Sequence, residues 1–225
     1  MVPEKEQAGW ERALIEGCRE LGFDLTEGQV RAFAAYGRMI RQWNRPAGLV
    51  SDRDLDRLVS RHFLDSLSLA RILVPLPGTR VLDVGSGAGF PGIPLKICCP
   101  GIDLTLLEPR EKPWFFLRQA VTDLSLMTVS VLRKRAESLP GRGDARARFH
   151  LVLARALAPL DRLIKVCSPL VCPGGILVAY KGSRWMQELA EAGESIRETG
   201  GRVAGRPVEV PGISAGRCLV LWQRS

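Results

Sequence analysis

In the run from Asp83 to Gly89, a carboxylate is followed by three alternate glycines, and such a loop can hold a small ligand against its backbone. The short run Arg80 to Leu82 before it predicts a buried strand, and Ile93 to Cys98 after it predict the first turns of a helix. The glycines therefore lie at a strand-to-helix corner. There, only glycine lets the backbone turn tightly and leaves no Cβ between the main chain and a ligand.

The spacing of the glycines limits which ligand fits. A dinucleotide fingerprint needs its third glycine where Phe90 stands, and the Gly-Lys-Ser or Gly-Lys-Thr of a phosphate-binding loop is absent. The remaining pattern, Asp-x-Gly-x-Gly-x-Gly, resembles the first motif of S-adenosylmethionine-dependent methyltransferases. Their cofactor carries a sulfonium and an ammonium group, which gives the carboxylate of Asp83 an electrostatic role. Glycine-rich corners also occur in α/β folds without a cofactor, and the loop alone leaves that alternative open.

A second carboxylate, Glu108, ends the next apolar run, which extends from Ile102 to Leu107. It follows Gly89 by 19 residues, a separation typical of the ends of two adjacent parallel strands in a βαβ unit. There its two oxygens would accept hydrogen bonds from both ribose hydroxyls of the cofactor. Taken alone, Glu108 also fits a charge near the start of a helix that begins near Pro113. Its pairing with the glycine loop favours the ribose role.

Length and composition predict one catalytic domain with a small appendage. The 225 residues, 46% of them hydrophobic, are enough to bury a sizeable core. No apolar run approaches the ~18 residues of a membrane span, and the charged start of the chain is unlike a signal peptide, so we expect a soluble, cytoplasmic protein. The six cysteines lie among apolar neighbours without Cys-x-x-Cys spacing, so we expect reduced packing residues and no metal.

The charge balance indicates a polyanionic partner. The net charge is +8, the pI is about 9.6, and 26 of the 32 basic residues are arginines, which suit bidentate phosphate contacts. Between Arg133 and Lys165 there are nine basic and three acidic residues, and between Arg31 and Arg61 seven arginines and three aspartates. Any single arginine is better explained as a solvated surface residue. The two clusters together favour binding to RNA or DNA.

Two parts follow one another along the chain. Residues 1–75 show three helical patterns: Trp10 to Leu21 is amphipathic, a capping box at Thr26 opens a helix through about Trp43, and apolar residues recur at helical spacing over 54–73. Together they predict an all-helical N-terminal cap. In residues 76–225, strands are expected at 80–83, 103–108, 128–132, 149–154, 175–180, 203–210 and 218–223. Seven strands with the ligand loop after the first predict a doubly wound, seven-stranded, Rossmann-like α/β methyltransferase domain.

Longer motifs are more specific than the glycines. They are Arg61-His62-Phe63-Leu64-Asp65-Ser66-Leu67, the run Asp83 to Pro94, Arg135-Ala136-Glu137, Arg155-Ala156 and Lys181-Gly182. In their order and spacing, the chain from about Trp43 onward resembles the bacterial small-subunit ribosomal RNA guanine-N7 methyltransferases, the glucose-inhibited division protein B family. The resemblance implies methyl transfer from S-adenosylmethionine to N7 of a guanine in the 530 loop of 16S ribosomal RNA. We expect a monomer whose partner is 16S ribosomal RNA or the small ribosomal subunit.

The resemblance also assigns roles to single residues. The expected cofactor-binding residues belong to the glycine corner and to the ends of the second, third and fourth strands: Asp83, Gly85, Gly87, Phe90, Glu108, Ala136, Glu137 and Arg155. Arg155 would also face the place where methyl donor and guanine meet, and Lys181 is the second candidate for a catalytic role. Each of these two also fits a plain surface charge. His62 and Asp65 share one helix face and would shape the cofactor lid, or pair with each other and Arg61.

This reaction requires few catalytic groups from the protein. Guanine N7 has a lone pair in its ring plane, so no general base is required, and catalysis rests on alignment of the reacting atoms. The base must also be exposed, by unstacking or flipping. Two alternatives stay open: a methyltransferase acting on another RNA, a protein or a small molecule, and a non-catalytic RNA-binding protein of the same fold. The family usually has Asn-Leu-Thr where this chain has Gly48-Leu49-Val50, which leaves some cap contacts in question.

Overall fold

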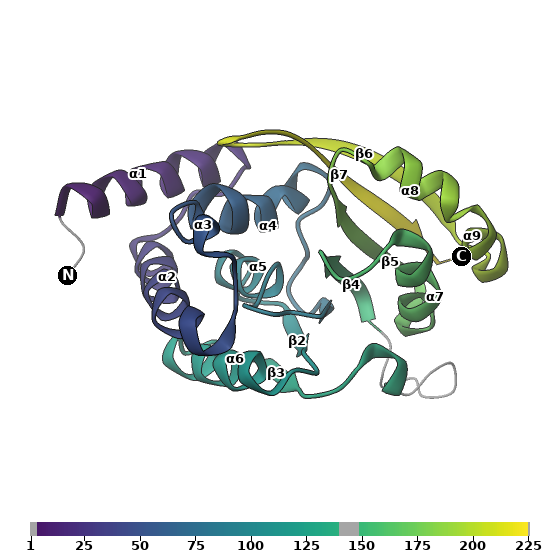
Figure 1. The fold of residues 1–225 in the computed structure, drawn as a ribbon, viewed down its shortest axis with the longest axis horizontal. Coiled ribbons are helices and arrows are strands. Elements are labelled where there is room, and N and C mark those ends of the chain that lie inside the picture. The colour runs from purple at the N-terminus through teal and green to yellow at the C-terminus, as the bar shows by residue number, and fades with distance from the viewer. Residues whose placement is uncertain (1–3, 140–148, 225) are drawn as a thin grey trace.

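The computed structural model describes residues 4–139 and 149–224, and a seven-stranded sheet forms its centre (Figure 1). The strands are β1 (Arg80–Val84), β2 (Asp103–Leu107), β3 (Val129–Leu132), β4 (Phe149–Arg155), β5 (Val171–Lys181), β6 (Arg202–Val210) and β7 (Ile213–Gln223). Their order is β3-β2-β1-β4-β5-β7-β6; β1 to β5 are parallel, and β7 is antiparallel to β5 and β6. The predicted doubly wound α/β fold is confirmed. Arg142, Asp144, Arg146 and Arg148 of the basic cluster lie outside the described residues.

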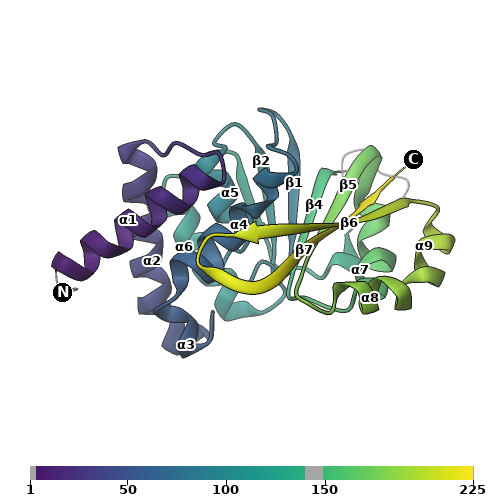
Figure 2. The same cartoon turned by 90° about the horizontal axis from the view of Figure 1, so that it is seen from above.

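Two hydrophobic clusters lie on opposite faces of the sheet. On β1, Val81 belongs to one cluster, whereas Leu82 and Val84 belong to the other. Successive side chains of a strand point to opposite faces, so the central strands are buried on both sides, as parallel sheets require. One face carries the N-terminal helices and α5 (Gly92–Cys98) and α6 (Glu111–Asp123), and the other carries α7 (Leu160–Cys167), α8 (Trp185–Glu191) and α9 (Gly193–Thr199) (Figure 2).

The N-terminal helices are α1 (Glu4–Glu20), α2 (Glu27–Ala47), α3 (Asp52–Leu55), the π-helix η1 (Val59–Leu64), α4 (Asp65–Leu67) and the 3-10 helix η2 (Ser68–Arg71). The capping box is confirmed, because Thr26 Oγ1 accepts from the Gln29 amide at 3.2 Å and Gln29 Oε1 accepts from the Thr26 amide at 2.9 Å. The helix expected over 54–73 is broken into short segments. The hydroxyls of Ser66 and Ser68 donate to carbonyls three or four residues earlier, and such bonds compete with a regular helix.

The turn after α2 is held by the helix cap at Gly48 and by the side chain of Asn44. Gly48 ends the helix in the left-handed region with a φ of 57°. The side-chain oxygen of Asn44 then accepts from the amides of Leu49 and Val50 at 3.1 and 2.9 Å. The turn therefore uses the backbone amides of Gly48, Leu49 and Val50, which do not depend on the side chains at these positions.

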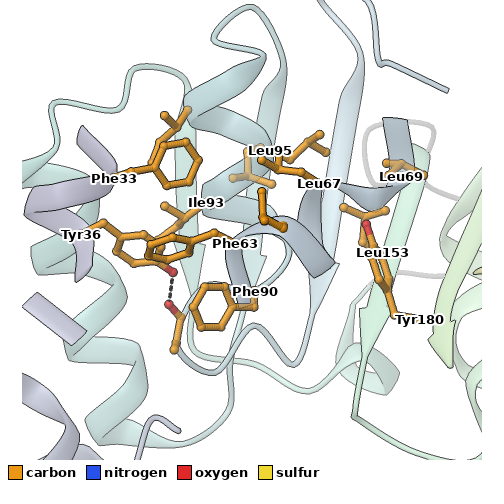
Figure 3. Packing of buried hydrophobic residues seen from close by; sticks show 14 of the residues in the cluster. Phe33, Tyr36, Phe63, Leu67, Leu69, Phe90, Ile93, Leu95, Leu153 and Tyr180 are labelled. Atoms are coloured by element: carbon orange, nitrogen blue, oxygen red, sulfur yellow. Dashed lines mark hydrogen bonds between the residues drawn. The ribbon is translucent and has the colours of Figure 1, made fainter. Parts of the chain in front are cut away.

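The cap packs directly on the glycine loop (Figure 3). Phe90 from the loop lies 5.7 Å from the ring of Tyr36 and 6.0 Å from that of Phe63, measured between centroids. The Tyr36 hydroxyl donates to the carbonyl of Ala88 in the same loop. Burying each large ring contributes about 1.5–3 kcal/mol, so this cluster fixes the loop against the cap.

Among residues 4–139 and 149–224, no helix combines the length and apolar character needed to cross a bilayer. These residues also contain no group of three or more His, Cys, Asp or Glu side chains placed to hold a metal ion. All six cysteines are free thiols, and Cys18, Cys167 and Cys218 are buried.

Candidate active site

The loop after β1 has the backbone that its glycines predict. Gly85, Gly87 and Gly89 have φ values of 71°, 55° and 94°, a region that side chains with a Cβ rarely adopt. At Gly85 a Cβ would also lie 2.5 Å from Cδ1 of Leu157, so a side chain there would have to displace the exposed Leu157 side chain in addition to straining the backbone. The loop thus presents bare backbone to the carboxyl edge of the sheet, where open α/β sheets bind ligands.

Asp83 is a fully buried carboxylate below this loop. Its Oδ2 accepts from the Gly92 amide at 3.0 Å, whereas its Oδ1 is buried without a hydrogen-bond partner among the described residues. Burial raises the pKa of the Asp83 carboxyl to about 7, and the Gly92 amide opposes that shift. A buried acceptor without a donor is costly, and a cationic ligand end nearby would offset that cost.

Glu108 follows β2 directly and is also buried. One carboxylate oxygen accepts from the Gly87 amide at 2.8 Å, and the other accepts from the amide and Nε of Arg110 at 2.9 and 3.0 Å. The carboxylate therefore ties the glycine loop to the start of α6. The Arg110 side chain is 60% exposed, whereas that of Glu108 is 2% exposed and lines neither of the two pockets described below, so binding of a ribose by Glu108 stays a prediction.

A pocket of about 230 Å³ lies beside Gly85, at the carboxyl ends of β1 and β2. Ala136 and Glu137, at the start of the 3-10 helix η3 (Ala136–Ser138), line it. The structure thus brings Ala136 and Glu137 to the glycine corner, as predicted. Of the eight predicted cofactor-binding residues, Gly85, Ala136 and Glu137 line this pocket, and the others do not: Asp83, Gly87, Phe90, Glu108 and Arg155. The ring of Phe90 is buried under the cap.

A second pocket, of about 590 Å³, lies at the carboxyl ends of β4 and β5. Arg155 and Lys181, the two residues predicted for a catalytic role, both line it. Leu157 and Ala158 line this pocket and the smaller one, so the loop after β4 forms the boundary between them. A ligand in one pocket and a substrate in the other would meet at that boundary.

Arg155 is held by several groups at once. Its Nε lies 2.9 Å from Oδ2 of Asp65, its Nη1 lies 3.2 Å from Nδ1 of His62, and its Nη2 donates to the carbonyl of Arg61. Burial, and next the charge of Arg155, lower the pKa of His62 to about 3. The imidazole is therefore neutral near pH 7, and its Nδ1 can accept the hydrogen bond from Arg155.

Asp65 is the residue on which this arrangement depends. It is buried, and its Oδ1 accepts from Nε of Arg217 at 2.8 Å while its Oδ2 pairs with Arg155. The alternative in which His62 and Asp65 pair with each other and Arg61 is wrong, because Asp54 pairs with Arg61 at 3.3 Å and faces His62 at 3.9 Å. Asp65 and Arg217 are 152 positions apart in the sequence, so no local spacing could have revealed their contact.

Lys181 secures the loop between the pockets. Its Nζ donates to the carbonyl of Ala158 at 2.8 Å and lies 2.6 Å from Oε2 of Glu188. The same Glu188 oxygen accepts from the Leu160 amide at 3.1 Å, at the start of α7. Sequence reasoning did not find Glu188, because neither its position nor its neighbours form a motif. Lys181 thus acts on the loop through its backbone, in addition to lining the larger pocket.

Comparison with known proteins shows which family the chain belongs to. The model of the family described as rRNA small subunit methyltransferase G matches residues 29–208. The protein named Ribosomal RNA small subunit methyltransferase G in Roseiflexus sp. (strain RS-1) is 39% identical over 92% of this chain and 89% of its own length, and its namesake in Staphylococcus carnosus (strain TM300) is 36% identical over 94% and 89%. A solved SAM dependent methyltransferase from Aquifex aeolicus shares the fold, with a TM-score of 0.57 at 18% identity over 82% of this chain and 98% of that one. The chain therefore belongs to the rRNA small subunit methyltransferase G family.

Proposed function

We propose that this protein transfers a methyl group from S-adenosylmethionine to N7 of a guanine in the 530 loop of 16S ribosomal RNA. The observation that carries the proposal is the junction of two pockets at the loop after β4, with the glycine corner on one side and Arg155 on the other. Membership of the family supports small-subunit ribosomal RNA as the substrate class. The excess of arginine supports a polyanionic partner.

The residues around the smaller pocket fit S-adenosylmethionine. Gly85 leaves the backbone accessible, and Ala136 and Glu137 would border the adenine. Glu108 lies outside the pocket lining and would bind the ribose once Arg110 releases its carboxylate. The buried carboxyl of Asp83, with its unpartnered oxygen and its pKa raised to about 7, lies below the loop, and a cationic ligand end nearby would favour its ionised form. When bound, the cofactor would supply an electrophilic methyl group that guanine N7 can attack without first losing a proton.

The task left to the chain is orientation and charge balance. Orientation falls to the loop after β4, which Lys181 and Glu188 hold at the boundary of the two pockets. Methylation at N7 leaves the base positively charged, which an isolated arginine would disfavour. Asp65 lies between Arg155 and Arg217 and offsets one of their two positive charges, and Glu188 offsets that of Lys181. The larger pocket would therefore oppose a cationic product less than its three cations alone would.

The test is to incubate the protein and labelled S-adenosylmethionine with small ribosomal subunits, and separately with free 16S ribosomal RNA, from cells lacking this modification. Mapping should place the label on one guanine N7 in the 530 loop. Label on another RNA position, or on protein, would replace the proposed substrate by that one. Isothermal titration with S-adenosylmethionine addresses the non-catalytic alternative, because the absence of measurable binding would refute the enzyme assignment.

A further inference from the structure

An exposed aromatic surface lies where the end of α2 meets α6. Phe115 on α6 is 47% exposed, although it is a large apolar side chain, and Trp43 at the end of α2 is half-buried beside it. A pocket of about 250 Å³ lies between the two helices. Its lining residues are Trp43, Pro46, Ala47, Lys112, Phe115 and Gln119, which we call the α2–α6 patch. Figure 1 shows the two helices side by side at this end of the molecule.

Each ring of the patch contacts another ring, buried in the case of Trp43 and half-buried in the case of Phe115. Trp43 lies 6.1 Å from the ring of Phe116, which is fully buried, at an interplanar angle of 60°. Phe115 lies 4.8 Å from Trp114, and the guanidinium of Arg118 lies 5.0 Å above the Trp114 ring. Preorganised rings lose little conformational freedom when a flat ligand stacks on them.

The charge around the patch is positive. Arg45, Arg110, Lys112 and Arg118 are all exposed and lie on the helical turns that form the patch or beside it. Of the nearby acids, Glu111 is paired with Arg133 at 3.1 Å, and Asp123 accepts from Nε2 of the patch residue Gln119 at 2.7 Å. The four cations therefore still outnumber the acids. Aromatic rings surrounded by arginine and lysine form a surface that suits single-stranded nucleic acid, because the bases stack on the rings and the cations contact the phosphates.

The patch also lies next to the cofactor loop. Arg110 bonds to Glu108, and one of its terminal nitrogens is 3.7 Å from the position that a Cβ of Gly87 would occupy. α6 begins at the following residue, Glu111, so Lys112 and Phe115 lie within its first two turns at the carboxyl edge of the sheet. RNA bound over the larger pocket can therefore extend along this edge onto the patch.

We propose that the α2–α6 patch binds the substrate RNA by stacking an unpaired base, near the target guanine in the folded RNA, on Phe115 and Trp43. This inference rests on the proposed function for the identity of the RNA. Because every base has an aromatic face, the contact does not depend on which base is stacked. Lys112 and Arg118 contribute the phosphate contacts.

The first experiment measures RNA binding directly, by the fluorescence anisotropy of a labelled single-stranded RNA at fixed salt. Phe115→Ala should weaken binding about 5- to 150-fold, the range found for loss of one stacked base, and Phe115→Trp should restore it. Met127→Ala is the matched control, because Met127 is an apolar side chain that is 76% exposed and lies just before β3, at the amino ends of the parallel strands. Unchanged affinity in Phe115→Ala, or an equal loss in Met127→Ala, would overturn the proposal.

A second measurement separates stacking from general adhesion. With an RNA whose bases are replaced by abasic sites, wild type and Phe115→Ala should bind equally, and a persisting difference would refute base stacking. Lys112→Gln should reduce the dependence of log affinity on log salt by about one unit, whereas Phe115→Ala should leave it unchanged; the reverse would contradict the assignment of roles.

If wild type binds RNA through Phe115 but methylates no ribosomal RNA, the proposed function fails and the patch stands. If it methylates ribosomal RNA and Phe115→Ala does so with the same KM for RNA, the patch fails alone.

Discussion

Replacing Asp65 tests whether the cap and the sheet are joined through one buried carboxylate. Its side chain is 4% exposed and lies 2.9 Å from Nε of Arg155 and 2.8 Å from Nε of Arg217, whose side chains are 14% and 22% exposed. Asp65→Ala leaves two largely buried cations without their common anion. Removing one member of a buried pair typically costs about 3–5 kcal/mol. For a chain of this size each kcal/mol lowers Tm by about 2–4 °C, so we expect a loss of about 6–20 °C.

The assays are thermal unfolding, which gives Tm, and urea unfolding, which gives the free energy of unfolding, both followed by tryptophan fluorescence. Asp56→Ala is the control, because its surface pair with Arg41 spans 3.7 Å and Asp56 is 88% exposed; such a pair contributes about 1 kcal/mol or less. Asp65→Asn, which keeps the shape and one acceptor, should fall between Asp65→Ala and wild type. A free energy of unfolding for Asp65→Ala within about 1 kcal/mol of wild type would refute the reasoning, since the two arginines would then be satisfied without the carboxylate.

Three further predictions concern the site. Glu108→Ala should weaken S-adenosylmethionine binding in calorimetry, whereas Arg155→Ala should mainly lower kcat; equal losses of binding would mean that their roles are wrongly divided. Glu188→Gln should lower kcat about 10- to 100-fold by releasing the loop after β4, whereas Glu194→Gln, an exposed residue of α9 outside both pockets, should not. Equal rates for both variants would contradict the positioning role. The pKa of His62 is lowered to about 3, so the unfolded chain takes up a proton below about pH 6.5 that the folded chain does not. The free energy of unfolding should therefore fall as the pH drops from about 6.5 towards 3, with a steeper fall in wild type than in His62→Gln; parallel curves would exclude the effect.

Local signals in the sequence were enough to predict the elements around the glycine loop. The strand before Asp83, the glycine corner and the carboxylate after β2 all follow from patterns within about 30 residues. The capping box at Thr26 is equally local, and it is confirmed. These features could be predicted because each depends on neighbours in the chain.

The contacts that surround Arg155 could not be predicted in this way. Asp65 meets Arg217 across 152 positions, and the carbonyl of Arg61 meets Arg155 across 94. Helical spacing over 54–73 suggested one continuous helix, and therefore a shared face for His62 and Asp65. The segment is broken into π, α and 3-10 turns, yet His62 and Asp65 both contact Arg155. Their other partners differ, because Asp65 also pairs with Arg217 whereas His62 faces Asp54. Packing of the chain as a whole decides which arginine a carboxylate reaches.

The cofactor loop is supported from two sides, and this explains why a cap and a sheet that look separate in the sequence share one site. From the cap, Tyr36 bonds to Ala88, and the His62 ring stacks on Phe90 at 4.7 Å between centroids. From the other side, Leu157 lies against Gly85, on the loop that Lys181 holds. Arg155 links both sides, because its guanidinium lies 5.6 Å from the Phe90 ring while it pairs with Asp65 of the cap. A shift of the cap would therefore move the glycine corner and the boundary between the two pockets together.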